Sequence, residues 1–203
     1  MDLNLIISLD ELKTTYKSNF FYYCLWCYIT TTKQSYYLSK DKRKKSFTMH
    51  STINKSAAKD WADCMSWRVL REHLKEFKEY AVEEKEGDLL IVVPFPILAH
   101  VINVVINSGA PVGSWSNYLR VWAYYWLACK GNQEQEVSQT VAARIIDMRY
   151  PTFNEITQKL LQLKLIERCG NYLYGGGIIN SHSYSYKIPE NILSLSQNDW
   201  NLE

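Results

Sequence analysis

The sequence has little glycine, proline or cysteine, the residues whose abundance marks collagen-like, Pro/Gly-rich or disulfide-rich proteins. Glycine and proline number only 8 and 5 among 203 residues, which excludes collagen-like and Pro/Gly-rich disordered chains. Five cysteines form an odd set without regular spacing, so a disulfide framework of the secreted kind is not expected. The first residues lack the basic, apolar and small-residue order of a secretory signal. We therefore expect a reduced, cytoplasmic protein.

An excess of charge of one sign is also missing. The chain has 23 Lys and Arg against 21 Asp and Glu, a net charge of +2, which excludes a histone-like polycation that holds nucleic acid by charge alone. Any contact with nucleic acid must therefore be local. Aromatic residues are abundant instead, with 15 Tyr and 7 Trp, and these large side chains predict that most of the chain is folded.

No apolar run is long enough to predict a membrane segment. Residues 20–29 fall well short of the roughly 20 apolar residues that a spanning helix needs. The longer run, residues 89–106, is interrupted by Pro94, Pro96, His100 and Asn103, which are costly in hydrocarbon. We therefore expect no membrane partner.

Charge and composition divide the chain into four segments. Residues 1–55 carry 9 basic and 4 acidic residues, and the polar stretch 30–56 shows no period, so this part is predicted to be an N-terminal extension and basic linker. Because regular patterning begins near Met49, we expect residues 49–203 to be self-sufficient. Residues 56–113 are predicted to be helical with one short strand, residues 114–189 to be a separate domain, and residues 190–203 to be a tail.

A long amphipathic helix is predicted over residues 56–81. Its apolar residues recur at spacings of 3 and 4 and form a narrow stripe: Trp67, Leu70, Leu74, Phe77 and Ala81. This stripe could be the seam of a homodimer, or it could pack within one chain. After it, residues 89–93 predict a buried strand, and Pro96 predicts the start of a helix over residues 96–107.

Residues 114–189 show an ordered series of elements. A helix is expected from about Ser116 to Cys129, a second begins at the N-cap Ser138, and a third begins at a capping box made by Thr152 and Glu155. Two strands then flank the Gly-rich loop 175–177. The third helix has a predicted apolar face of Phe153, Ile156, Leu160 and Leu163, and predicted outward residues Asn154, Thr157, Gln158, Lys159 and Gln162.

This region resembles the winged helix-turn-helix superfamily, chiefly in residues 160–168, LLQLKLIER, which are similar to the end of a recognition helix and the start of the wing. The family usually has Gly where Lys164 stands. The resemblance implies an α+β, mainly helical protein whose C-terminal domain carries a two-stranded wing. A looser resemblance, in the short strand with Pro at residues 91–94, is to phage and plasmid replication initiators or replisome organisers.

The resemblance implies sequence-specific binding of double-stranded DNA, in replication initiation or in transcription regulation of a mobile element. The third helix would enter the major groove, and the wing, with Lys187 and the polar loop 180–183, would contact the backbone or the minor groove. The expected DNA-binding residues are Arg149, Tyr150, Thr152, Asn154, Gln158, Lys159, His182 and Lys187. Asn154 and Gln158 could equally be plain solvent-facing residues, and Thr152 could be only a helix cap.

A second function stays open, because residues 114–188 carry 8 basic and 5 acidic residues, a thin excess for a DNA-binding protein. Winged helices also dock proteins, so the alternative is a structural or adaptor protein.

Sequence patterns for chemistry are weak. Cys24 and Cys27 form a single C-x-x-C pair without the second pair of a zinc site, so packing explains them better. The four histidines are far apart, and the 175–177 glycines lack the context of a phosphate loop. The basic cluster at 40–45 is a solvated charge run, with phosphate binding as the alternative. We expect no metal, no cofactor and no enzymatic activity.

Overall fold

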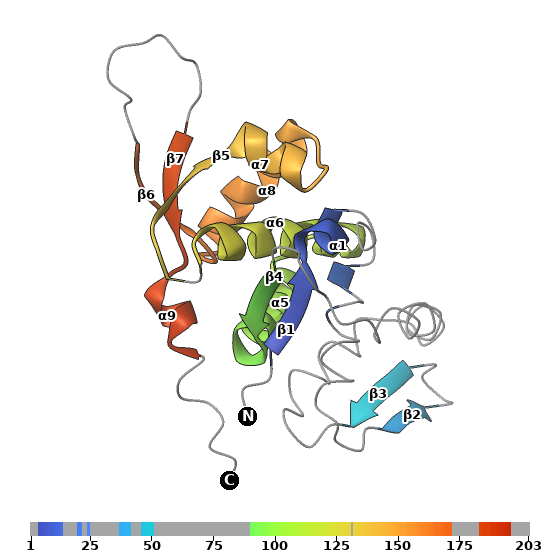
Figure 1. The fold of residues 1–203 in the computed structure, drawn as a ribbon. Helices are drawn as coiled ribbons and strands as arrows, with labels where there is room; N and C mark the ends of the chain where they lie inside the picture. The colour runs from blue at the N-terminus through green and yellow to red at the C-terminus, as the bar shows by residue number, and fades with distance from the viewer. Residues whose placement is uncertain are drawn as a thin grey trace, which may run out of the picture.

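The computed structural model of the protein describes residues 4–13, 20, 21, 24, 37–41, 46–50, 90–130, 132–171 and 183–195 (Figure 1). Within these residues the chain is α+β and mainly helical. In chain order the elements are β1 (Asn4–Ser8), α1 (Leu9–Lys13), β2 (Tyr37–Asp41), β3 (Ser46–His50), β4 (Leu90–Pro94), α5 (Phe95–Asn107), the 3-10 turn η1 (Val112–Ser114), α6 (Trp115–Ala128), β5 (Gln135–Ser138), α7 (Gln139–Ile145), α8 (Tyr150–Gln162), β6 (Glu167–Asn171), β7 (Ser183–Lys187) and α9 (Glu190–Leu193).

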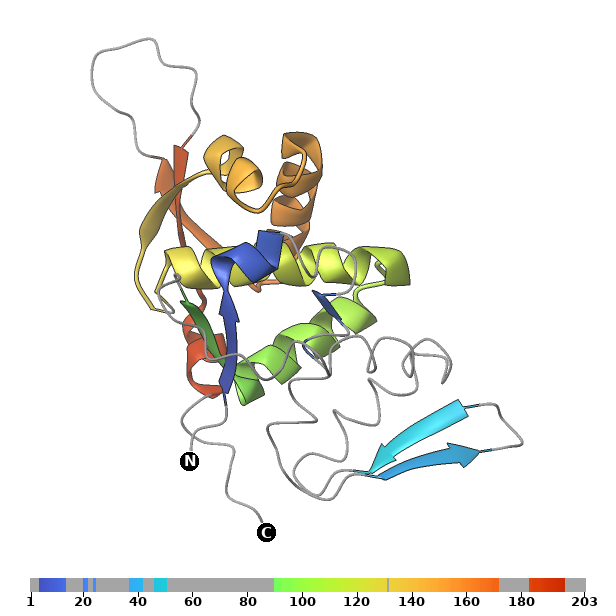
Figure 2. The same cartoon turned by 45° about the vertical axis from the view of Figure 1, so that its right-hand side comes forward.

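Helix α6 is the central element. It crosses the middle of the molecule, with α7 and α8 on one side and β1, β4 and α5 on the other (Figures 1 and 2). Its sequence is apolar around most of its circumference, and such a helix is stable only when it is covered on several sides. Trp122 and Tyr125 are accordingly almost fully buried. The helix predicted from about 116 to 129 is confirmed.

The N-terminal residues belong to the same core as the C-terminal helices. Strand β1 pairs antiparallel with β4, with Asn4 opposite Pro94 and Ser8 opposite Leu90. Leu12, Phe20, Phe21 and Cys24 are buried in the cluster that α5 and α6 also form. This arrangement argues against the expectation that residues 49–203 are self-sufficient, because without the first 48 residues β4 would lose its partner strand and the core would lose large apolar side chains. The segment boundaries at 55, 113 and 189 stay predictions.

The long apolar run at 89–106 forms two elements rather than one. Strand β4 ends at Pro94, and α5 begins at the next residue with Pro96 in its first turn, where a missing N–H costs no hydrogen bond. The strand and helix predicted here are confirmed to within a residue or two. In the part of the chain that the structure describes, no helix is both long and apolar enough to cross a membrane.

A hairpin occupies part of the predicted linker. Strands β2 and β3 pair antiparallel, with Tyr37 opposite His50 and Asp41 opposite Ser46. The stretch 30–56, predicted to be a linker because it shows no period, therefore contains a strand pair. Each strand has only five residues, and a period of two is hard to detect over that length when Lys, Ser and Thr stand among the apolar residues.

A three-stranded antiparallel sheet follows α6, in the order β5-β7-β6. Val137 of β5 lies opposite Tyr184 of β7, and β6 has a bulge between Arg168 and Gly170. The two predicted strands are β6 and β7, but β5 was expected to be a loop. Its four residues contain one buried side chain, Val137, which is too little to show alternation.

Helix α7 starts after Ser138 as predicted, whereas α8 starts earlier than predicted. The N-cap of α8 is Arg149, and no side chain caps it by a hydrogen bond, so the capping box of Thr152 and Glu155 is wrong. Pro151 has its φ already fixed near the helical value and carries no N–H, which suits the first turn. The helix therefore begins before Thr152 can act as its cap.

Three helices end at a left-handed residue that is not glycine: Lys130 after α6, Asp147 after α7 and Lys164 after α8, with φ of 46°, 48° and 56°. After α7, the N–H of Met148 donates to Ala143 O at 2.8 Å and that of Asp147 to Arg144 O at 3.1 Å. Helix α8 repeats this pattern, which satisfies carbonyls that a helix end leaves open. Lys164 thus occupies the conformation for which glycine is usual.

The C-terminal part is not simply a tail. Helix α9 buries Ile192 and lies near α5 (Figure 1). Other predictions fall outside the described residues: the helix at 56–81 with its homodimer seam, Cys27, most of the basic cluster, the 175–177 glycines and His182.

Candidate nucleic-acid interface

A buried set of polar side chains joins α7 to the sheet. The Nε2 of Gln139, the first residue of α7, donates to the Tyr186 hydroxyl at 2.8 Å. Tyr186 is fully buried on β7, and its ring centroid lies 4.9 Å from that of Tyr125 on α6. Burial raises the pKa of Tyr186 and of Tyr125. Both phenols therefore stay neutral and hold α6, α7 and the sheet in one relative position.

The same set reaches α8 through Thr157. The hydroxyls of Tyr125 and Thr157 are 3.2 Å apart, and Thr157 donates to the carbonyl of Phe153 at 2.9 Å. Thr157 was predicted to face outward, and this is wrong because it is fully buried. A threonine hydroxyl can be satisfied by the carbonyl one turn earlier, so this side chain can lie on the buried face of a helix.

The other predictions for α8, of which side chains are buried and which face outward, are confirmed in part. Phe153, Ile156 and Leu160 are buried, while Leu163 is the half-buried C-cap. Gln158, Lys159 and Gln162 are exposed and Asn154 is half-buried. The apolar stripe therefore turns α8 so that a polar row faces away from α6.

Four expected DNA-binding residues of α8 lie on two flanks of the helix, and Gln158 lies in the outward row between them. Since successive residues are about 100° apart, Tyr150 and Asn154 fall on one side of the outward row, and Thr152 and Lys159 fall on the other. Gln158 Nε2 donates to Asn154 Oδ1 at 3.4 Å, which links the first flank to the outward row. The two flanks cannot both face the floor of one groove, so they would meet its opposite walls.

Arg149 and Tyr150 stand at the start of α8. Both are exposed, and Tyr150 has 48% of its surface accessible. The Arg149 guanidinium has no ion pair among the described residues, so it is available to a ligand. The structure therefore places an exposed arginine and an exposed tyrosine at the N-terminal end of α8, directly after the turn that follows α7.

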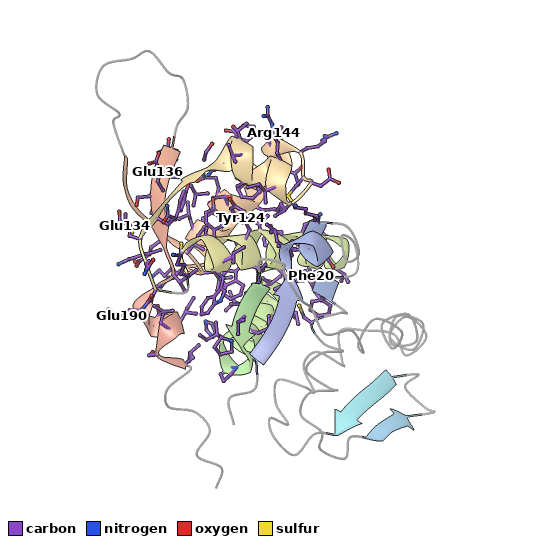
Figure 3. All side chains as sticks on the ribbon, in the orientation of Figure 1. Phe20, Tyr124, Glu134, Glu136, Arg144 and Glu190 are labelled. Carbon is purple, nitrogen blue, oxygen red and sulfur yellow. The ribbon has the colours of Figure 1, made fainter. Side chains whose placement is uncertain are left out.

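Two residues of this surface were missed from the sequence. Arg144 is exposed in the last turn of α7, and Figure 3 labels it on that helix. Val141, one turn earlier, is 51% exposed. The sequence marks Arg144 only as a cation near a helix C-terminus, where the helix dipole alone favours it. Arg144 and Arg149 stand on either side of the tight turn at Asp147.

An acidic residue also lies in the outward row of α8. Glu155 is exposed and follows Pro151 by one turn. Counting residues 139–164, the cations are Arg144, Arg149, Lys159 and Lys164 and the anions are Asp147 and Glu155, a net charge of +2. The surface is therefore only weakly positive.

The sheet presents a different balance of charge. Lys187 Nζ lies 3.1 Å from Glu167 Oε2, and this contact raises the pKa of Lys187. The guanidinium of Arg168 lies over the Tyr184 ring at 4.3 Å. Figure 3 shows Glu134, Glu136 and Glu190 on this side of the molecule. Lys187, an expected backbone contact, is thus already engaged by a carboxylate.

Neither Cys129 nor Cys169 is an activated nucleophile. Cys129 is buried, its Sγ donates to the carbonyl of Tyr186 at 3.4 Å, and burial raises its pKa to about 12. Cys169 is exposed, and its pKa is also raised, first by desolvation and then by Glu134. A thiol that stays protonated is a poor nucleophile. In the described ranges, no three His, Cys, Asp or Glu side chains are grouped to hold a metal ion.

Comparisons with known proteins add no assignment, since no protein-family model, curated protein or solved structure matches the chain.

Proposed function

We propose that residues 114–189 form a winged helix that binds double-stranded DNA, with α8 in the major groove. The order of elements supports the fold: three helices, α6, α7 and α8, are followed by the antiparallel pair β6 and β7, and β5 completes the sheet. The tight turn between α7 and α8 supports a helix-turn-helix arrangement.

One observation carries the DNA-binding proposal. Arg144, Arg149 and Lys159 are exposed on α7 and α8, and none has an ion pair among the described residues. Unpaired cations around an exposed polar helix suit a ligand that brings its own negative charges, and phosphates flank each groove of DNA. The polar side chains of α8 would then read base edges.

The biological role rests on the resemblance to replication initiators. We propose that the protein marks a specific duplex site of a mobile element, for replication initiation or for transcription regulation. Affinity would come from Arg and Lys contacts to phosphates, and the protein would make no covalent change in the DNA.

Selection from a random duplex pool tests the proposal. The full chain is mixed with random-sequence duplexes, the bound fraction is amplified, and the enriched duplex is titrated by fluorescence anisotropy at several salt concentrations. We expect enrichment of one motif and an affinity that falls as salt rises, since each phosphate contact releases counterions. A pool that stays random after repeated rounds would reject sequence-specific binding.

Arg149→Ala tests the assignment of the surface. We expect a loss of about 1–3 kcal/mol in affinity for the selected duplex, with thermal stability unchanged because the exposed Arg149 side chain makes no capping hydrogen bond to α8. The control is Lys130→Gly, which removes one positive charge from the end of α6 at a position whose left-handed backbone suits glycine. Equal losses in the two variants would mean that only total charge matters and that the groove assignment is wrong.

Protein docking is the second candidate. Glu155 in the outward row of α8 and the exposed Val141 and Tyr150 favour it, because an anion repels phosphates while apolar surface suits a protein partner. The salt dependence of binding separates the candidates. An apolar protein interface should change little with ionic strength, whereas DNA binding should weaken steeply.

A further inference from the structure

Arg120 is a buried cation in the middle of the core. It lies on α6, and only 2% of its surface is accessible. Its Nε donates to the carbonyl of Leu12 at 3.0 Å, its Nη2 donates to the carbonyl of Ile146, and its Nη1 donates to Asn117 Oδ1 at 3.3 Å. All three guanidinium nitrogens are therefore engaged.

The two carbonyls belong to separate parts of the chain. Leu12 lies in α1, and Ile146 is the C-cap of α7. Ile146 directly precedes the left-handed Asp147, and Arg149 follows three residues after Ile146 as the N-cap of α8. One side chain thus connects the N-terminal segment to the turn that determines where α8 begins.

The charge of this side chain is balanced locally. Burial lowers the pKa of Arg120, and the negative charge of Asp147 acts in the opposite direction. A guanidinium can be buried when its planar donors all find acceptors and an anion lies close by. Lysine has the same charge but a single ammonium group, so it cannot reproduce the fork that bonds two carbonyls from different segments.

We propose that Arg120 is a positioning residue: it holds the turn between α7 and α8, and with it the start of α8, against the N-terminal segment. The part of this inference that concerns DNA rests on the proposed function. The N-terminal residues would then support the binding surface without forming part of it.

The first test measures the turn directly, by amide hydrogen exchange in the full chain. The N–H groups of Asp147 and Met148 close the turn after α7, and those of Lys164 and Leu165 close the equivalent turn after α8. In Arg120→Lys we expect exchange about tenfold faster at the first pair and nearly unchanged exchange at the second. Asn117→Ala is the control, because it removes only the contact within α6 and should leave both pairs close to the wild type.

Two results would overturn the inference. One is a folded Arg120→Lys variant with wild-type exchange at Asp147 and Met148. The other is an equal acceleration at Lys164 and Leu165, which would mean that the substitution merely lowers global stability.

The second test uses the selected duplex. Because Arg120 is buried and reaches no phosphate, we expect Arg120→Lys to weaken binding about tenfold while the slope of log affinity against log salt stays constant. Loss of a phosphate contact would lower that slope by about one. Wild-type affinity in the folded variant would overturn the DNA part. If the wild type binds no duplex, the proposed function fails, whereas the exchange test still decides whether Arg120 positions the turn.

Native-state exchange of the wild type keeps the inference testable if Arg120→Lys does not fold. With increasing low concentrations of denaturant, the amides of β1 and those of the turn after α7 should open with the same free energy and the same denaturant dependence. A turn that opens while β1 stays protected would overturn the proposed connection.

Discussion

The helix pair α7–α8 and the sheet β5-β7-β6 share one core, but they differ in whether their exposed Lys and Arg side chains have partners. In the sheet, Lys187 pairs with Glu167, and Arg168 covers the ring of Tyr184. In the helix pair, Arg144 and Arg149 are exposed with no ion pair among the described residues. Lys and Arg side chains are thus engaged by other side chains on the sheet, whereas on α7 and α8 they remain available to a ligand.

This difference indicates where an anionic ligand would approach. A phosphate group near Lys187 must compete with the carboxylate of Glu167, and near β5 it would meet Glu134 and Glu136. At Arg149, no carboxylate of the described part of the chain is paired with the guanidinium, so a phosphate would not have to displace one. Favourable contacts should therefore be concentrated on α7 and α8, and the strands should contribute less than the resemblance implies.

The largest expected effect is a loss of folding stability when the N-terminal residues 1–48 are removed. A chain that starts at Met49 lacks β1 and the buried Leu12, Phe20 and Phe21. These three side chains contribute together roughly 5–9 kcal/mol, at about 1.5–3 kcal/mol each. That sum approaches the whole stability of an ordinary domain, about 5–15 kcal/mol.

We therefore expect this shortened chain to show no cooperative urea transition when it is followed by tryptophan fluorescence. The control starts at Asn4 and retains β1. A sharp transition at the midpoint of the control would show that the segment is dispensable.

The next largest loss of stability should come from removing the buried side chain that joins the sheet to α7. Tyr186 is fully buried and bonds Gln139 of α7, so Tyr186→Ala should cost about 3–5 kcal/mol. Tyr184, two residues earlier on the same strand, is half-buried, and Tyr184→Ala should cost clearly less. Denaturant midpoints measured for both variants test the order. Equal costs would mean that the buried polar set does not hold the sheet against the helices.

A smaller effect, on duplex affinity, should distinguish a carboxylate on α8 from a carboxylate on the sheet. Glu155→Gln removes a negative charge from the outward row of α8 and should raise duplex affinity about twofold to fivefold, the effect of one charge near phosphates in a high-dielectric surround. Glu136→Gln removes a negative charge from β5 and should leave affinity unchanged. Anisotropy titrations at one salt concentration compare them. A larger gain in Glu136→Gln would place the DNA on the sheet.

Long periodic segments of the fold could be predicted from the sequence. Helices α5 and α6 and the core face of α8 follow from apolar spacings that extend over several turns, and Ser138 marks the start of α7. Strands of four or five residues could not be predicted where one buried residue, such as Val137, carries the whole pattern. Helix α8 starts before the capping pattern of Thr152 and Glu155, because Pro151 suits the first turn of a helix.

The site was predictable only in part, for a physical reason. Exposed Arg149 and Tyr150 follow from their place before an amphipathic helix. Arg120 stands in an apolar helix, and its two carbonyl acceptors lie 108 and 26 residues away along the chain, so no local pattern shows its role. The burial of Thr157 likewise depends on Tyr125, which belongs to another helix.

The smallest expected effect concerns the turn that joins the two regions. Lys164 closes α8 just before the chain enters β6, with a φ of 56°, and an L-residue in this conformation costs roughly 1–2 kcal/mol. Lys164→Gly removes that cost but adds about 0.5–1 kcal/mol of unfolded-state entropy, which leaves a net stabilisation of about 0–1.5 kcal/mol. Lys164→Ala keeps the strain and should not stabilise. Thermal unfolding should therefore rank Gly above Lys and Ala, and a destabilised glycine variant would show that the lysine side chain itself holds the turn.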